Sequence, residues 1–178
     1  DSLVLDEREF AIAWGFHPGD YHRIKMHGRL VATPRWQQAY GRDYEYTGRV
    51  NTALPLETLT AAVGRIQTIV SWSREEIDGR LNGLLLNWYD GNLGHYIGRH
   101  RDSTRNMIEG APIVTLSFGE SRRFRLRPYR APTEPVDFEA GNGTVFVMPY
   151  ETNLAWTAYS GQSERAIRFK MNAPSGAS

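Results

Sequence analysis

The sequence contains no cysteine, and this absence alone excludes several classes of protein. Without thiols the chain cannot form a disulfide framework, a thiolate zinc site, an iron–sulfur centre or a cysteine nucleophile. No apolar run approaches the roughly 18 residues that a membrane span requires, and no basic-then-apolar leader opens the chain. We therefore expect an intracellular protein of the cytoplasm or nucleus, with no membrane partner, whose metal ligands are histidines and carboxylates.

The composition is that of an ordinary globular domain. The chain has 178 residues, of which 40% are hydrophobic and 23% charged, which is enough to bury one sizeable core. It shows no internal repeat and no low-complexity segment, and residues 174–178 read as a frayed tail. The sequence thus predicts a single domain over residues 1–178, with no obligate protein partner.

The net charge of +1 is uninformative, but its distribution is uneven. Between residues 99 and 130 there are eight arginines against three acidic residues, an excess of five positive charges. Such a segment is typical of a surface that faces a polyanion. A solvated strand face has the same pattern, so charge alone leaves both interpretations open.

Hydrophobic spacing predicts one helix and several short strands. Leu56, Leu59, Val63, Ile66 and Val70 recur at three- and four-residue steps, which indicates an amphipathic helix over about 56–71. Strands are indicated by apolar or alternating runs bounded by turn residues, at 81–89, 113–118, 123–127, 144–148 and 165–171. Many short strands with one clear helix favour a mainly β fold, a β-sandwich or jelly roll with one or two supporting helices.

The most informative local motif is His100-Arg101-Asp102. On an extended segment residues i and i+2 point to the same side, so the imidazole and the carboxylate can reach one metal ion. With a distant histidine they would form the facial triad of non-haem Fe(II) oxygenases. The motif arises easily by chance, and its context gives it weight.

That context resembles the AlkB-type Fe(II)/2-oxoglutarate-dependent dioxygenases. The stretch NWYDGNLGHYIGRHRDS around His100 is similar to the family's N-x-Y…IG-x-H-x-D segment. Three further segments match in the same order: PRWQQAYGRDYEYTG, PIVTLSFGESRRFRLR and GTVFVMPYETNLAWT. With the last strand, which ends at Met171, they extend over roughly residues 34 to 171. The resemblance implies a double-stranded β-helix, Fe(II) and 2-oxoglutarate as cofactors, and nucleic acid as partner.

The resemblance also implies roles for particular residues. His100 and Asp102 would be iron ligands and the catalytic centre, and Asn87 and Tyr89 would donate hydrogen bonds to 2-oxoglutarate. Arg165 would pair with the distal carboxylate of 2-oxoglutarate, since a guanidinium offers a carboxylate a bidentate fork. If Ile167, Phe169 and Met171 face the core, Arg165 faces inward with them.

Two positions depart from the family pattern. Ala158 stands where the family usually has its distal iron histidine, and a methyl group cannot donate to iron. Met171 stands where it usually has a second arginine, and Arg168 and Lys170 have the opposite parity on that strand. His95 precedes His100 by five residues, which favours a packing or substrate-contact role over ligation. These departures predict impaired turnover.

The segment around residues 34–48 interleaves aromatic and basic side chains. Base-repair enzymes take the base out of the stack and hold it against aromatic rings. We therefore expect substrate contacts from Arg35, Tyr40, Tyr44 and Tyr46, with Arg101 beside the metal motif. A tyrosine-rich edge packed over the sandwich is the alternative.

Three functions remain open at this point. The first is oxidative demethylation of alkylated bases in DNA or RNA, which is the reaction that the resemblance implies. The second is a catalytically inactive nucleic-acid-binding member of the fold, because the distal histidine is missing. The third is an oxygenase that hydroxylates a small molecule or a protein side chain.

Overall fold

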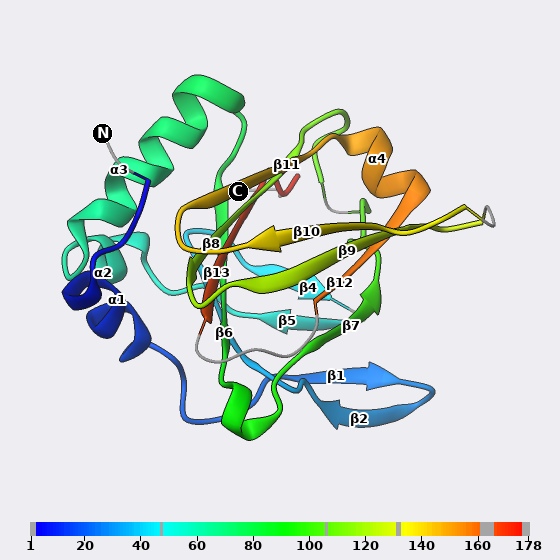
Figure 1. The fold of residues 1–178 in the computed structure, drawn as a ribbon, viewed down its shortest axis with the longest axis horizontal. Coiled ribbons are helices and arrows are strands. Elements are labelled where there is room, and N and C mark those ends of the chain that lie inside the picture. The colour runs from blue at the N-terminus through cyan, green and yellow to red at the C-terminus, as the bar shows by residue number, and fades with distance from the viewer. Residues whose placement is uncertain (1–2, 47, 106, 131–132, 161–165, 176–178) are drawn as a thin grey trace.

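The structure, a computed structural model, describes residues 3–46, 48–105, 107–130, 133–160 and 166–175 (Figure 1). Its helices are α1 (Glu7–Trp14), α2 (Leu56–Thr60), α3 (Gly64–Trp72), a π-helical turn (Ser73–Ile77), a 3-10 turn (Gly91–Leu93) and α4 (Tyr150–Ala155). Figure 1 shows α1, α2 and α3 gathered at one side of the strands and α4 at the other.

Within the described residues, the paired strands are antiparallel and form two sheets and two hairpins. The major sheet has the order β11-β8-β13-β6-β3, and its strands are β3 (Trp36–Tyr40), β6 (Gly83–Tyr89), β8 (Ile113–Gly119), β11 (Thr144–Met148) and β13 (Ala166–Asn172). The minor sheet has the order β10-β9-β12-β7, and its strands are β7 (Ile97–His100), β9 (Arg122–Pro128), β10 (Val136–Ala140) and β12 (Trp156–Ser160). The hairpins are β1 (Arg23–Met26) with β2 (Arg29–Ala32), and β4 (Tyr44–Tyr46) with β5 (Arg49–Asn51).

The major sheet has two different faces because successive side chains of a strand point to opposite sides. One face packs against α1, α2 and α3 and forms the larger apolar core, to which β13 contributes Ile167, Phe169 and Met171. The other face looks toward the minor sheet. A smaller apolar cluster that includes Leu126, Met148 and Ala158 closes part of that space, and polar side chains occupy the rest. This is the predicted jelly roll with supporting helices.

The predicted strands are confirmed with small shifts at their ends, but the helical prediction was incomplete. The helix expected over 56–71 is two helices, because Val63 has an extended backbone (φ −129°, ψ 87°) and α3 begins at Gly64. Leu59, Val63 and Ile66 nevertheless lie in one core, so the apolar spacing is satisfied across the break.

Helix α1 was missed although its start has a sequence signal. Asp6 accepts a hydrogen bond from the backbone N–H of Glu9, and the Glu9 side chain accepts one from the backbone N–H of Asp6. This capping box is readable as Asp-x-x-Glu before an apolar run. The helix matters for the fold because the carbonyl of its Ala13 accepts from the indole N–H of Trp88, which is fully buried on β6.

Part of the C-terminal segment is held to the body of the protein. Pro174, at the start of the segment expected to be frayed, forms an isolated bridge with Met107, and residues 176–178 lie outside the described part. Within the described residues, no helix is both long and apolar enough to span a membrane.

Candidate active site

His100 and Asp102 converge at the end of β7, inside the space between the two sheets. The Nδ1–H of His100 donates to the carbonyl of Gly98 (2.9 Å), so its Nε2 keeps a lone pair. That Nε2 lies 3.9 Å from Oδ1 of Asp102, with the two side chains 19% and 13% exposed. Burial lowers the pKa of His100, although the charge of Asp102 acts against this. The imidazole is therefore held in the neutral form that metals bind.

A buried amide fixes the backbone of Asp102. Asn153, on α4, accepts from the Asp102 N–H (3.2 Å) and donates from its Nδ2 to the Asp102 carbonyl (3.1 Å). The side chain is almost fully buried. Asn153 thereby positions the Asp102 carboxylate from a separate element, a role that nothing in the sequence pattern indicated.

Ala158 lies directly opposite His100. The two residues are Cα partners between β12 and β7, and directly opposed side chains lie about 4.5–5.5 Å apart at Cβ. A histidine at 158 would share the face of His100, but alanine offers no donor atom. Among the described residues, no group of three His, Cys, Asp or Glu side chains converges in a way that would hold a metal ion. His100 and Asp102 thus fit two of the three positions of a facial triad.

Lys170 and Tyr44 complete the surroundings of Asp102. The ammonium of Lys170 lies 2.5 Å from Oδ1 of Asp102, and the Tyr44 hydroxyl donates to the same oxygen (3.3 Å). Burial acts to raise the pKa of Asp102, but the charge of Lys170 and the hydrogen bonds from Lys170 and Tyr44 hold it below its usual range. The carboxylate is therefore ionised, and Lys170 is its counter-charge.

A second cation, Arg168, lies on the same face of β13 as Lys170. It is opposite Asn87 of β6 and Ser117 of β8, and its guanidinium lies over the ring of Phe124 from the minor sheet (5.1 Å). The side chain is buried, and within the described residues its Nε and Nη2 have no hydrogen-bond partner. Burial lowers its pKa. An orphaned guanidinium between the sheets fits a carboxylate-bearing ligand.

The predicted 2-oxoglutarate residues are only partly brought together. Asn87 and Tyr89 are buried on β6 and share the inward face with Arg168. Arg165 lies outside the described residues. The face that carries Ile167, Phe169 and Met171 is the one covered by helices, so sharing their parity does not direct a side chain of this strand toward Asn87. It is Arg168 and Lys170, which parity had set aside, that share the face of Asn87.

Two more guanidinium groups make this interior strongly cationic. The Nε of Arg35 donates to Oδ1 of Asn87 (2.9 Å), and Arg122 lies over the ring of Tyr89 (4.3 Å). Burial lowers the pKa of Arg122 to about 10, and the nearby charge of Arg168 acts in the same direction. An anionic ligand between Arg122 and Arg168 would stabilise both buried cations and reduce the repulsion between them.

The predicted aromatic contacts divide into two groups. Tyr44 and Tyr46 stack with ring centroids 6.4 Å apart, and Tyr46 meets the ring of His100 edge-on at 6.4 Å. Tyr40 is a correction: it is 1% exposed in the core beneath the helices, so its ring has no open face for a base. Burial raises the pKa of Tyr44 to about 12, which keeps the hydroxyl protonated.

His95 has the packing role that its spacing favoured. Its Nδ1 accepts from the backbone N–H of Asp90 (3.1 Å), so its proton is on Nε2, which lies 2.9 Å from the Tyr21 hydroxyl. The ring is buried edge-on against Trp36. Both nitrogens are in use, and neither is available to a metal.

Two adjoining grooves lead outward from Asp102. The first, of about 540 Å³, is lined by Asp102 and Tyr46 and extends to Arg101 and Leu154. The second, of about 680 Å³, shares Arg101 and Leu154 with it and is walled by Tyr129 and Trp156 among other residues. We call the pair the outer groove. The guanidinium of Arg101 lies over the exposed ring of Tyr129 (4.5 Å).

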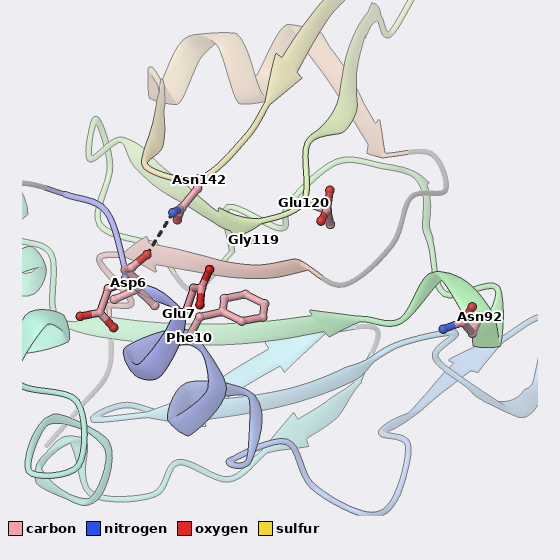
Figure 2. A pocket seen from close by; sticks show the side chains of 8 residues that line it. Asp6, Glu7, Phe10, Asn92, Gly119, Glu120 and Asn142 are labelled. Atoms are coloured by element: carbon pink, nitrogen blue, oxygen red, sulfur yellow. Dashed lines mark hydrogen bonds between the residues drawn. The ribbon is translucent and has the colours of Figure 1, made fainter.

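A separate cavity of about 500 Å³ lies where α1 begins, beside the turn between β8 and β9 (Figure 2). The Nδ2 of Asn142 donates to the carbonyl of Leu5 at its edge. Asp6, Glu7 and Glu120 give this cavity a negative lining. It shares no lining residue with the outer groove, and its charge does not suit a phosphate.

The jelly roll, the His100–Asp102 pair and the cationic interior together define an oxygenase of the Fe(II)/2-oxoglutarate class. Comparison with known proteins agrees: residues 15–168 match the family described as the 2OG-Fe(II) oxygenase superfamily. The chain belongs to this superfamily, whose cofactors are Fe(II) and 2-oxoglutarate.

The curated relatives are proteins named DNA oxidative demethylase ALKBH2. Those of Mus musculus, Bos taurus and Homo sapiens are each 28% identical to this chain over 152, 153 and 151 residues. The alignments cover 79% of this chain but 60%, 52% and 55% of the relatives. The chain therefore spans half to three fifths of the length of the curated relatives it matches.

Two solved structures show the same fold at low identity. "The structure of OsALKBH1" has a TM-score of 0.59 at 12% identity, covering 96% of this chain and 92% of that one. An oxidoreductase of the 2OG-Fe(II) oxygenase family from Burkholderia pseudomallei has a TM-score of 0.55 at 15% identity, covering 99% and 86%. The predicted fold class and family are confirmed.

Proposed function

We propose that this chain binds 2-oxoglutarate and an alkylated base in nucleic acid, the two substrates of oxidative base demethylation. The observation that carries the proposal is the buried guanidinium of Arg168, whose Nε and Nη2 have no hydrogen-bond partner among the described residues. It lies on the same strand face as Lys170, which contacts Asp102. The names of the curated relatives, DNA oxidative demethylases, support the choice of reaction.

For 2-oxoglutarate, Arg168 would supply the bidentate partner of one carboxylate. Asn87 is fixed by Arg35, and its amide faces the same interior. Tyr89 lies beside it on β6, beneath Arg122. Three buried guanidinium groups on one side of the sheet suit a dicarboxylate, whose two charges offset the cost of burying them.

For iron, the ligands would be Nε2 of His100 and a carboxylate oxygen of Asp102. Fe(II) with 2-oxoglutarate and O₂ supplies the oxidation of an N-methyl group, which leaves as formaldehyde. The chain contributes position: Gly98 orients the imidazole, and Asn153 holds the backbone of Asp102. Ala158 adds no ligand, so we expect turnover well below that of a variant with histidine there.

For nucleic acid, the outer groove offers a stacking surface beside phosphate-binding charges. A base held near Tyr46 and Asp102 would place its neighbour toward Tyr129, where Arg101 and Arg130 both lie over the ring (4.5 and 5.4 Å). Aromatic rings flanked by arginine suit single-stranded nucleic acid, because stacking tolerates any base and the cations neutralise phosphate.

A second candidate function is that of a nucleic-acid-binding protein without turnover. It is favoured by Ala158 and by the Lys170–Asp102 ion pair, which occupies a carboxylate oxygen that a metal would use. In this alternative the outer groove binds nucleic acid, while the site at His100 and Asp102 catalyses no reaction.

The deciding experiment measures succinate release on methylated single-stranded oligonucleotides, for the natural chain and for Ala158→His. We expect Ala158→His to gain at least a hundredfold in turnover, because a missing iron ligand is restored opposite His100. Ala61→His, an exposed alanine at the end of α2, is the matched control and should gain nothing. Tight, salt-dependent oligonucleotide binding with no release by either chain would establish the second function.

A further inference from the structure

The carboxylate of Asp102 is already engaged by an internal cation. Its Oδ1 accepts hydrogen bonds from the Lys170 ammonium (2.5 Å) and from the Tyr44 hydroxyl (3.3 Å). This is the carboxylate that, together with His100, would bind the proposed metal. Lys170 is itself 12% exposed, so its charge cannot be solvated where it lies. Each group is therefore the other's principal compensation in a buried setting.

Lys170 is also held in place from its own side. It lies on β13, which is the middle strand of the major sheet, and its Cα partners are Leu85 and Thr115. Its ammonium donates to the Tyr44 hydroxyl (3.1 Å) and lies 4.7 Å from the centre of the Tyr44 ring. Because its backbone lies in the central strand and its ammonium is hydrogen-bonded, the Lys170 side chain cannot reorient into solvent.

We propose that Lys170 is a built-in competitor of the metal for Asp102, so that the chain binds a divalent cation much more weakly than the same site without this ammonium. The inference rests on the proposed metal site. A divalent ion on Oδ1 would displace Lys170 and then lie within a few ångströms of a fixed like charge, which costs free energy in a poorly solvated site. Ala158 leaves the site without its third protein ligand, and Lys170 competes with the metal for Asp102.

The consequence is that restoring the ligand and removing the rival are separate gains. Ala158→His adds a donor without touching the ion pair, and Lys170→Met frees the carboxylate without adding a donor. Because both act on one metal ion, the double variant should bind more tightly than either single variant.

The test is Mn²⁺ affinity of the metal-stripped protein without 2-oxoglutarate, measured by titration calorimetry and by the electron paramagnetic resonance signal of free Mn²⁺. Lys170→Met should bind Mn²⁺ at least tenfold more tightly than the natural chain. Lys25→Met, which removes an exposed lysine of β1, is the matched control and should not change it. Equal or weaker binding by folded Lys170→Met overturns the proposal.

Thermal unfolding gives a second readout that a purely structural role would not produce. In EDTA, Lys170→Met should melt below the natural chain, because Asp102 is left buried and unpaired. Millimolar Mn²⁺ should then raise its melting temperature more than that of the natural chain, and equal shifts reject the competition. If Lys170→Met does not fold, Lys170→Gln decides between the same outcomes. Failure of the proposed function would instead appear as absent succinate release, whatever the Mn²⁺ affinity.

Discussion

The two faces of β13 are formed by alternate residues of one strand and have different roles. Ile167, Phe169 and Met171 enter the apolar core beneath the helices, while Arg168 and Lys170 enter the space that holds Asp102. Both faces are buried, so burial does not distinguish them. The faces differ in how their buried groups are paired. The apolar side chains pack against one another, whereas on the polar face two guanidinium nitrogens of Arg168 have no hydrogen-bond partner among the described residues. The first face stabilises the fold, and the second is the face on which we propose that 2-oxoglutarate binds.

The sharpest way to break this contrast is on the apolar face. Phe169→Ala removes a buried ring that packs edge-on against Phe118 at 4.7 Å. We expect the free energy of unfolding to fall by about 3–5 kcal/mol, because a large cavity opens in the core. Urea unfolding followed by circular dichroism measures it, and a loss below 1 kcal/mol would mean that this face is not the main core.

On the polar face, Arg168→Met should leave the free energy of unfolding unchanged or raise it, because an uncompensated buried cation becomes apolar. The affinity for 2-oxoglutarate should fall about 30-fold or more, the usual cost of removing one partner of a buried charge pair. Calorimetry with Mn²⁺ present checks the affinity. Arg127→Met, on the outward face of β9, is the control, and unchanged affinity in Arg168→Met would refute the assignment.

The outer groove extends the contrast from the interior to the surface. Tyr129→Ala should weaken binding of a single-stranded oligonucleotide about five- to tenfold, because a partly exposed stacking ring is lost. The slope of affinity against salt should stay the same, since no cation is removed. Fluorescence anisotropy across a salt series measures both quantities. Tyr96→Ala, an exposed tyrosine outside the groove, should bind like the natural chain.

The smallest effect is expected on the outer face of the minor sheet, where Arg125 pairs with Asp137. The hydrogen bond from Arg125 lowers the pKa of Asp137, so the pair contributes stability at neutral pH and loses it as the pH falls through the lowered value. Asp137→Asn should be slightly less stable than the natural chain at pH 7 and equal to it near pH ~2. Thermal melts at the two pH values test this, and a gap that widens in acid contradicts it.

Much of the fold was predictable because alternation and turn residues are local signals. The strands at 113–118 and 144–148 lie where the pattern placed them, and in the strand predicted at 123–127 Phe124 and Leu126 share the apolar cluster between the sheets. Helix α1 was readable from its capping box but has only one fully buried residue, Ala13, and so a weak apolar pattern. The break before Gly64 was invisible because the buried residues on both sides keep helical spacing.

The site was predictable where it depends on spacing and not where it depends on three-dimensional facing. His100 and Asp102 converge because they flank one residue. Parity correctly separated Arg168 and Lys170 from Phe169, but it could not say which of two buried faces contains the chemistry. That choice is made by the helices, which cover one side of the sheet. Lys170 meets Asp102 across 68 residues, a contact that no local pattern encodes.

The amide clasp of Asn153 on the peptide of Asp102 has a consequence for how a metal would arrive. Both of its hydrogen bonds are made to backbone atoms, so they neither compete with a ligand nor depend on one. The backbone of Asp102 is therefore held without any ion, so loading of the proposed metal site would not have to order the turn that follows β7. At the proposed metal site, the slow step of assembly would then be an exchange of partners at one carboxylate oxygen, with no folding of the loop.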